Sequence, residues 1–459
     1  MYIKKSILLI VCSVFFGYSL CAQIEMSTQF VDQLIQSSYA NPAQFGKFRF
    51  TMNLPSAYAG FYNTGFKPSN FTTQEGTLFT IDANKLIEEV QDNGLSFQAG
   101  FKAESFGLAL NFNKFFIQAY HGVRGYNNFT IPEETFDFLF NGNGRFVGET
   151  LGLGMEFNSL VYSELGLGLG IKINDKLNVG VKLKYLSGLT TIQTAKSDLE
   201  IYTDPEYYQL KFNTDYMINT GGLTESALVS ENRTDYLFGP NNGFAFDIGA
   251  LFKVNKKFTL GASLINVGSI KWEEHLNSYQ SSGEFQYDGI ELNAFIEDDV
   301  IDFDEVVDSL NASFEVLEVS REFNTRTPVS FNITGSYEFA KRLYVGALYA
   351  YQDQFNKDVH AVAINLRKDL GSVFSIGTQY AFLGGTAHNI GLTTVLKVGP
   401  LQLYFIADNV LPIFNPLTTQ HFNTRVGLNL VVGFTDKRNE KKLAKKEEKK
   451  ARKAFEKGN

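Results

Sequence analysis

Residues 164–185 alternate between apolar side chains and small or charged ones on both sides of a short turn. The stretch reads ELGLGLGIKINDKLNVGVKLKY, with Asn174-Asp175-Lys176 between its two halves. Alternation with a period of two is typical of a strand with one apolar face, and two such runs around a tight turn predict a β-hairpin. The apolar face of this hairpin must meet either a protein core or a lipid bilayer.

The same pattern recurs four times further along the chain. Alternating apolar runs flank short turns at 255–257, 340–342, 368–372 and 399–400. These runs are roughly 9–11 residues long, the length of a tilted strand that crosses a bilayer, whereas strands of soluble proteins average ~5–6 residues. The connections between hairpins are longer and unequal, as they are on the outer side of outer-membrane barrels. They lie at 188–242, 268–328, 352–358, 383–387 and 409–423. The pattern therefore favours a membrane barrel.

We expect an all-β fold, a transmembrane antiparallel β-barrel of about 14 strands with a small helical insertion in an outer loop. Twelve or sixteen strands are also compatible, because the strand boundaries between 95 and 157 are blurred. After residue 22 the chain has no run of ~18 apolar residues, so only a closed barrel would satisfy its backbone in lipid. A soluble secreted β-sandwich is the alternative. That fold would not explain why short turns and longer loops alternate along the chain.

The first 22 residues have the features of a secretory signal peptide. Two lysines precede an apolar run from Ile7 to Phe16, and Ala22 supplies the small residue before a cleavage site. We therefore expect a mature chain without residues 1–22, located in the outer membrane of a Gram-negative cell envelope. Both cysteines lie inside this segment, so the mature chain would have no thiol for disulfides, metal binding or catalysis.

Composition narrows the possible functions. Aromatic residues make up 14% of the chain, as expected of a barrel with aromatic girdles at two membrane interfaces. The net charge is −8 although residues 436–457 carry eleven Lys and Arg against five Asp and Glu, so the body is acidic and unsuited to nucleic acid. The five histidines show no paired catalytic or metal-binding spacing. We expect neither an enzyme nor a cofactor or metal site.

The last predicted strand, RVGLNLVVGF, places apolar residues on one face and ends in phenylalanine. A final strand of this kind resembles the signal by which barrel-assembly machinery recognises outer-membrane proteins. Leu430, Val432 and Phe434 are the candidate residues of this assembly signal.

Four sequence motifs together resemble a known family. They are SYANPAQF after the signal, LGLGIKINDKLNVGVKLKYLSG, LGASLINVGSIKW and the closing DNVLPIFNP with RVGLNLVVGF. The chain resembles uncharacterised Bacteroidota outer-membrane β-barrel proteins of a domain-of-unknown-function family. It is more distantly similar to the long-chain fatty-acid transporter and to the barrel of type IX secretion. In the fatty-acid transporter an N-terminal segment plugs the lumen, which implies that residues 23–46 here enter a barrel formed by 47–434.

Within the hairpin at 164–185, the larger apolar residues should then face lipid. The opposite face should point into the lumen, where glycines would let the plug or a neighbouring strand approach closely and lysines would line a wet interior. The candidate residues of this face are Gly166, Gly168, Gly170, Lys172, Lys182 and Lys184.

The largest outer loop contains a segment with helical periodicity. Apolar residues recur there at three- and four-residue spacing, as in an amphipathic helix, at Phe303, Val306, Val307, Leu310, Phe314 and Leu317. The helix would be either a lid or docking surface for a ligand or partner, or a cover packed on its own loop. The neighbouring aspartates lack the glycine and distal glutamate of a calcium loop.

Residues 435–459 form a basic tail that should lie in the periplasm. It would contact peptidoglycan or an acidic periplasmic protein, or simply form a solvated helix without partners. Two functions fit the whole pattern. One is a plugged channel for uptake of a small hydrophobic molecule, and the other is a non-enzymatic scaffold or accessory barrel for protein secretion or surface assembly. Outer-membrane lipid is an expected partner of either.

Overall fold

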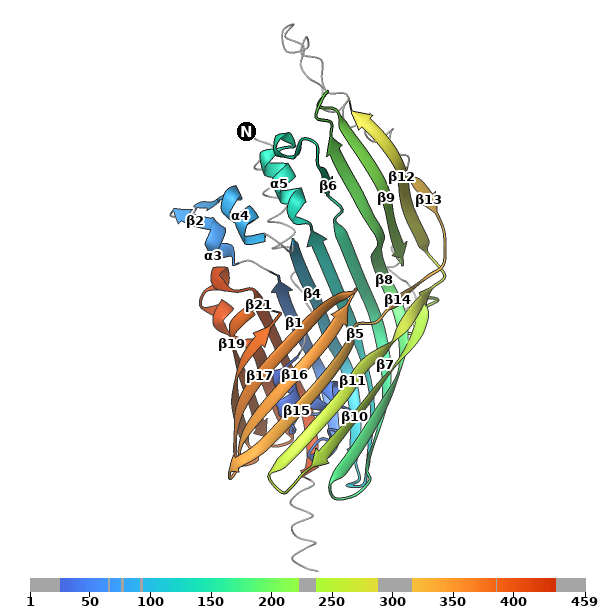
Figure 1. The fold of residues 1–459 in the computed structure, drawn as a ribbon. Coiled ribbons are helices and arrows are strands. Elements are labelled where there is room, and N and C mark those ends of the chain that lie inside the picture. The colour runs from blue at the N-terminus through green and yellow to red at the C-terminus, as the bar shows by residue number, and fades with distance from the viewer. Residues whose placement is uncertain are drawn as a thin grey trace, which may run out of the picture.

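The computed structural model describes residues 25–434 apart from 65–66, 76–77, 91–93, 223–236, 288–315 and 385. Within these residues, fourteen antiparallel strands close into a barrel (Figure 1). In order around the wall they are β1 (Phe48–Asn63), β4 (Leu95–Asn111), β5 (Phe115–Ile131), β7 (Glu156–Lys172), β8 (Leu177–Thr203), β10 (Asn242–Lys253), β11 (Phe258–Trp272), β15 (Val329–Ala340), β16 (Leu343–Gln354), β17 (Lys357–Leu370), β18 (Phe374–Leu383), β19 (Thr386–Val398), β20 (Leu401–Asn409) and β21 (His421–Phe434). The predicted fold class is confirmed.

The first and last strands close the barrel. β1 pairs with β21 from Phe48 opposite Phe434 to Tyr62 opposite His421, and its other edge pairs with β4. Each strand of the wall therefore has a hydrogen-bonded neighbour on both sides, and none of the fourteen is left as an open edge. A closed ladder is the arrangement that lets strands cross lipid.

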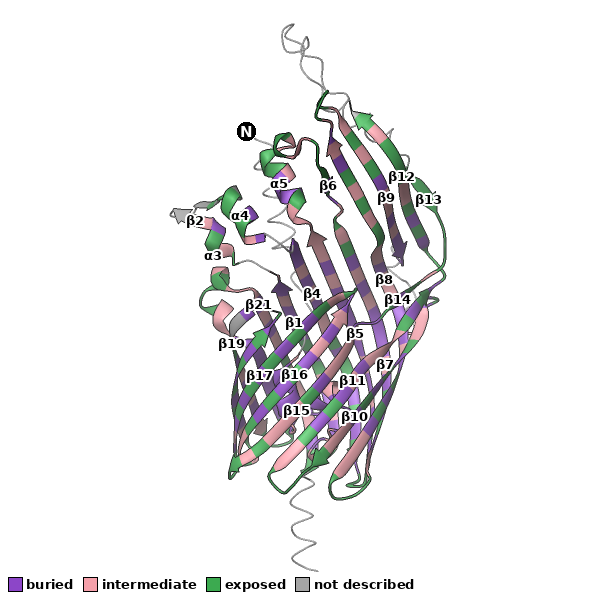
Figure 2. Ribbon diagram, viewed as in Figure 1, coloured by how far each residue is buried: buried purple, intermediate pink, exposed green. Residues whose placement is uncertain are grey.

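The two faces of the wall have opposite character (Figure 2). Outward-facing leucines are among the most exposed side chains, with Leu167 61% and Leu183 69% accessible, whereas Gln118 and Lys182 on the inner face are almost fully buried. Soluble proteins place apolar residues inside and charged residues outside. The inverted pattern matches a barrel whose outer wall lies in lipid. No helix among the described residues is long and apolar enough to cross a membrane.

The segments that connect consecutive strands differ in length between the two ends of the barrel. Short turns join the strands at the end where β1 begins and β21 ends, drawn at the bottom of Figure 1. Outer-membrane barrels place their short turns in the periplasm, so we call this the periplasmic end. The longer connections lie at the opposite, outer end.

A sheet extends the wall beyond the outer end. β8 continues past the barrel to Thr203 and pairs there with β9 (Leu210–Gly221), which pairs with β12 (Leu276–Tyr287); β12 in turn pairs with β13 (Leu317–Val319). The short strands β6 (Thr150–Gly152) and β14 (Phe323–Arg326) pair with β8 and β11. Much of the predicted loop at 188–242 is therefore strand. Its pattern is weakly apolar because charged side chains such as Glu200 face solvent.

Helices cap the other side of the outer end. They are α3 (Pro68–Phe71), α4 (Ala83–Val90) and α5 (Glu133–Asn141), with the small hairpin β2 (Thr72–Glu75) and β3 (Leu78–Ile81) and the 3₁₀ turns η2 (Gly144–Phe146), η4 (Leu411–Ile413) and η5 (Pro416–Thr418). Leu86, Ile87 and Val90 of α4 pack with Phe136 of α5 in one apolar cluster.

Two predicted segments lie wholly or mostly outside the described residues. They are the basic tail at 435–459 and the outer-loop helix with Phe303, Val306, Val307, Leu310 and Phe314. The last residue of that helical pattern, Leu317, lies in strand β13.

Candidate functional site

Residues 25–46 lie inside the barrel, and we call them the plug. The plug contains the 3₁₀ turn η1 (Ser27–Phe30) and the short helix α2 (Ser37–Ala40), both seen in blue within the lumen in Figure 1. The backbone amides of Met26 and Ser27 donate to the Asp408 carboxylate at 2.9 and 2.7 Å. At the other end of the plug, the Asn41 amide donates to two carbonyl oxygens of the wall.

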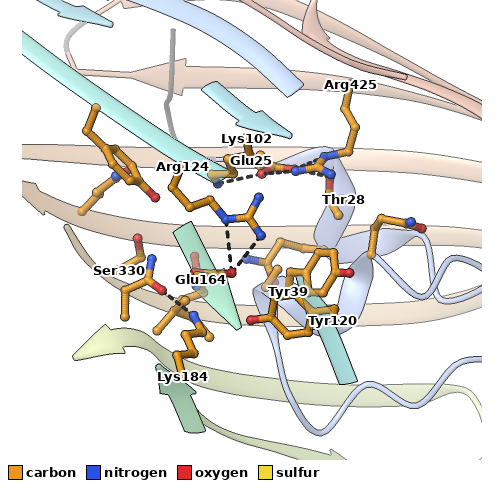
Figure 3. A pocket seen from close by; sticks show the side chains of 18 residues that line it. Glu25, Thr28, Tyr39, Lys102, Tyr120, Arg124, Glu164, Lys184, Ser330 and Arg425 are labelled. Carbon is orange, nitrogen blue, oxygen red and sulfur yellow. Dashed lines mark hydrogen bonds and ion pairs between the residues drawn. The ribbon is translucent and has the colours of Figure 1, made fainter. Parts of the chain in front are cut away.

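Glu25 is held in the lumen by two cations of the wall (Figure 3). Its carboxylate accepts a bidentate pair from Arg425 of β21 at 2.7 and 2.9 Å, and Lys102 of β4 donates to it at 2.7 Å. Burial alone would raise the pKa of Glu25, but the charges of Arg425 and Lys102 outweigh it and hold the pKa well below its usual range. Glu25 is therefore an anion at neutral pH.

The same arginine begins a chain of buried ion pairs across the wall. Arg425 donates to Glu104 at 3.0 Å, Arg124 donates to the same carboxylate at 2.9 Å, and Arg124 also reaches Glu164 at 2.8 Å. We call Glu25, Glu104, Arg124, Glu164 and Arg425 the ion ladder. The four wall members come from β4, β5, β7 and β21, so the ladder joins the last strand of the wall to three of its first four strands.

A second acidic residue of the plug is clamped near the periplasmic end. Asp32 lies 2.9 Å from Arg367 of β17 and 2.8 Å from Lys47. Burial opposes ionisation here as well, but Arg367 and Lys47 prevail and lower the pKa of Asp32 to about 2. Two carboxylates, those of Glu25 and Asp32, therefore hold the plug at two different depths in the lumen.

A small polar cavity lies between the plug and the wall (Figure 3). Its volume is ≈ 70 Å³, and Tyr39 of the plug, Tyr120, Arg124, Lys184 and Asn332 are among its lining residues. A space of this size holds water molecules but is several times smaller than a usual ligand pocket, about 300–1,000 Å³. With the plug in place, this cavity is therefore too small for a molecule much larger than water.

The three glycines chosen from the sequence all lie on the lumenal face. A Cβ added at Gly170 would lie 2.1 Å from the Phe45 ring of the plug, whereas one at Gly166 would meet Tyr120 of the neighbouring strand at 2.3 Å. Gly168 is less crowded, with Lys182 at 3.2 Å. The tightest backbone approach of the plug is elsewhere, at Gly180, where a Cβ would lie 2.2 Å from the Pro42 carbonyl oxygen.

Of the three lysines, Lys182 and Lys184 lie on the lumenal face, and Lys184 lines the polar cavity. Lys182 and Lys184 are buried, because the plug and neighbouring side chains cover them. Lys184 pairs with Asp247 at 2.8 Å, and Lys182 donates to Ser38 at 3.3 Å while lying over the Tyr39 ring. Lys172 is half-exposed beside the periplasmic turn, where it pairs with Asp175.

An aromatic layer lies one step outward from the ion ladder. On the inner face of three strands, Arg124 is followed by Tyr126, Glu164 by Tyr162 and Lys184 by Leu186. Tyr126, Tyr162 and Leu186 belong to one buried cluster. Its other members are Tyr58, Leu160, Ala245, Ile270, Trp272 and Leu276. We call this cluster the aromatic layer. An apolar lumenal layer differs from the polar interior usual in porins.

Ser105, His121 and Ser163 meet on the outer wall, a constellation that the sequence did not reveal. The two histidine nitrogens lie 2.5 and 2.8 Å from the hydroxyl oxygens of Ser105 and Ser163. Polar groups facing lipid are costly unless they are hydrogen-bonded. The contacts give each histidine nitrogen a partner, which accounts for the arrangement without catalysis. Among the described residues, no acidic, histidine or cysteine side chains cluster as metal ligands would.

The candidate assembly residues lie where the barrel closes. Leu430 pairs with Met52, Val432 with Phe50 and Phe434 with Phe48. All three therefore belong to the seam at which the last strand, β21, pairs with the first strand, β1.

The ion ladder was also missed from the sequence, although a signal for it exists. Glu164 stands on the same strand face as Gly166, Gly168 and Gly170, inside the very hairpin that showed the alternation. A charged residue on the inner face of a barrel strand can be recognised from strand parity. Its partner, Arg124 of the neighbouring strand β5, could not be identified, because strand parity does not give the register of β5 against β7.

The chain is similar to known proteins in sequence and in fold. A family model described as "Family of unknown function (DUF5723)" matches residues 42–408. No curated protein matches the sequence. Similar solved structures include the TodX deltaS2S3 mutant, a monoaromatic hydrocarbon channel, with 10% identity over 87% of this chain and 95% of that chain and a TM-score of 0.45. A Pseudomonas aeruginosa FadL homologue has 12% identity over 91% and 100% of the two chains, with a TM-score of 0.42.

We predict that Gly180→Val loosens the plug. The new Cβ would overlap the Pro42 carbonyl oxygen, which is backbone and cannot rotate away. The expected result is a raised single-channel conductance in planar bilayers. Gly152→Val is the matched control, since a Cβ at Gly152 has open space around it. Equal conductance of the two variants would contradict the close approach.

We predict that Glu25→Gln weakens plug docking by about 3 kcal/mol, because it leaves Arg425 and Lys102 without one of their carboxylate partners. The open fraction in single-channel recordings should rise by about two orders of magnitude. Glu149→Gln, on the exposed outer surface, should leave the recordings unchanged. An unchanged open fraction in Glu25→Gln would show that this contact does not hold the plug.

Docking should also depend on pH in a defined direction. The pKa values of Glu25 and Asp32 are lower in the docked state than their ordinary values of 4.5 and 3.8. Their contribution is therefore complete above about pH 5 and is lost as the pH falls toward 2. The open fraction in single-channel recordings should be constant from neutral pH down to about 5 and should increase below about pH 4. The variant with Glu25→Gln and Asp32→Asn should lose most of this acid response.

Proposed function

The chain belongs to the DUF5723 family of unknown function, and we propose that this member is a plugged outer-membrane channel for uptake of a small hydrophobic molecule. The aromatic layer carries the proposal. Apart from Leu276 of β12, its side chains occupy the inner face of the wall, where a channel for polar solutes presents hydrophilic groups. An apolar solute entering from outside would meet this layer before it reaches the ion ladder and the plug.

Below the aromatic layer, a further apolar surface supports the same route. Met26 and Phe30 of the plug pack on a lumenal patch of small and aliphatic residues from β16, β17 and β18, including Ala350, Ala361 and Ala381. Movement of the plug would uncover this patch. An apolar solute could then exchange one apolar contact for another, and burial of its surface at each step favours binding.

The ion ladder would act as the barrier in this scheme. Buried charged pairs exclude apolar solutes unless the plug carries Glu25 away from Arg425 and Lys102. The structure has the plug docked, and the proposed route is therefore closed in this state. Opening requires at least the Glu25 contacts to break.

The protruding outer sheet favours the second candidate, a scaffold for secretion or surface assembly. β9, β12 and β13 lie beyond the barrel mouth and offer surface that transport alone does not require (Figure 1). Purification of the full chain in mild detergent, followed by mass spectrometry, separates the two roles. A co-purified apolar small molecule supports the channel, and a stoichiometric protein partner without one supports the scaffold.

Uptake of a small apolar dye tests the channel directly. Gram-negative host cells that make the protein should accumulate 1-N-phenylnaphthylamine faster than cells without it. Tyr162→Asp places a charge in the aromatic layer and should return uptake to the level of cells without the protein. Tyr207→Asp, at a 67% exposed outer position, is the matched control. Both variants must show the heat-modifiable gel shift of a folded barrel, and equal uptake by both would overturn the proposal.

A further inference from the structure

The periplasmic end of the barrel carries a ring of cations. Each of its six short turns has a lysine or arginine in the turn or within three residues of it. In these windows, ten Lys and Arg stand against three Asp and Glu. We call the ten cations the basic rim: Lys114, Lys172, Lys176, Lys253, Lys256, Lys257, Lys341, Arg342, Lys368 and Lys397.

Most of these cations have no carboxylate partner in the described part of the chain. Among the ten rim cations, all of them described residues, the one ion pair joins Lys172 to Asp175 at 2.8 Å. Lys176, Lys256, Lys257 and Lys341 are all exposed. The rim therefore presents positive charge to whatever surrounds the barrel, and it is not neutralised by the described protein groups.

The rim directly borders the apolar band of the outer wall. Phe112, Phe115, Val254 and Phe339 are exposed beside the same turns. The ammonium of Lys114 lies 5.6 Å from the centre of the Phe115 ring. Aromatic side chains of this kind mark the level at which hydrocarbon gives way to headgroups. The cations consequently stand at the depth of lipid phosphates.

The ring shape indicates the kind of partner. A protein partner would dock on one side, whereas the cations are spread over all six turns around the circumference. Lipid is the component that contacts a barrel on every side. The outer end is different, since residues 196–215 of the protruding sheet carry five Asp and Glu against two Lys.

We propose that the basic rim binds the phosphate groups of anionic phospholipids in the periplasmic leaflet. Ammonium and guanidinium groups form charge-assisted hydrogen bonds with phosphate, and clustered cations beside a bilayer select anionic over zwitterionic lipid. Bound lipids would hold the barrel at a fixed depth and keep the periplasmic entrance to the plug level with the headgroups. This role is independent of what the lumen transports.

Lipid selection by the purified full chain tests the proposal. The protein is placed in nanodiscs of equal parts phosphatidylglycerol and phosphatidylcholine, and the lipids retained after release are counted by native mass spectrometry. The variant K176Q/K256Q/K257Q/K341Q removes four rim charges. The matched control K67Q/K85Q/K196Q/K211Q removes four lysine charges at the outer end.

The wild type and the control should retain phosphatidylglycerol preferentially, and the rim variant should lose about tenfold of that preference. Both variants keep residues 435–459, so any contribution of that basic segment is equal. Equal selection by the two variants, or no preference in the wild type, would overturn the proposal. A preference that survives in the rim variant but disappears in the control would place the lipid contacts at the outer end instead. The heat-modifiable gel shift confirms that each variant is folded.

Discussion

Burial of charge inside the lumen is the constraint on which the rest of the structure depends. Taking an ion out of water costs several kcal/mol, and the cost is offset only when every charge has well-placed partners. Arg425 meets this condition through Glu25 of the plug and Glu104 of the wall. The wall and the plug are therefore not independent. Without the plug, Arg425 and Arg367 of the wall would each lose one carboxylate partner. Without the wall cations, burial of Glu25 and Asp32 would be uncompensated.

Two of the local irregularities in strand pairing lie beside buried carboxylates. The pairing of β4 with β5 shifts by one residue between Glu104 and Phe106, and the pairing of β10 with β11 shifts next to Asp247. A bulge inserts an extra residue and re-aims neighbouring side chains. At both places a carboxylate points inward to meet a cation. In a barrel without bulges, only the odd or even position of an acidic residue along its strand would decide whether it faces the lumen.

The sequence predicted the wall better than its contents. Period-two alternation depends on one strand and its surroundings, so Leu167 and Gly168 could be assigned to opposite faces without knowing any neighbour. The fourteen-stranded barrel and the family resemblance followed from such local patterns and are confirmed. The ion ladder could not be predicted in the same way, because Glu25 and Arg425 are far apart in sequence and meet only when the last strand closes on the first. The strand at 191–203 was missed for another reason, since outside the bilayer its faces are not sorted into apolar and polar.

The central claim is that residues 25–46 occupy the lumen and are held there. Cross-linking tests it most directly. The chain has no cysteine after residue 22, so no other thiol in that part of the chain would react with the reagent. Ser38 and Gln118 are hydrogen-bonded across the plug and the wall at 2.8 Å. In the variant S38C/Q118C, a short bifunctional thiol reagent should join the two positions in the folded barrel, and the cross-linked barrel should stay closed in bilayer recordings even at pH 3. Absence of the cross-link in folded protein, or free opening once it has formed, would contradict the account.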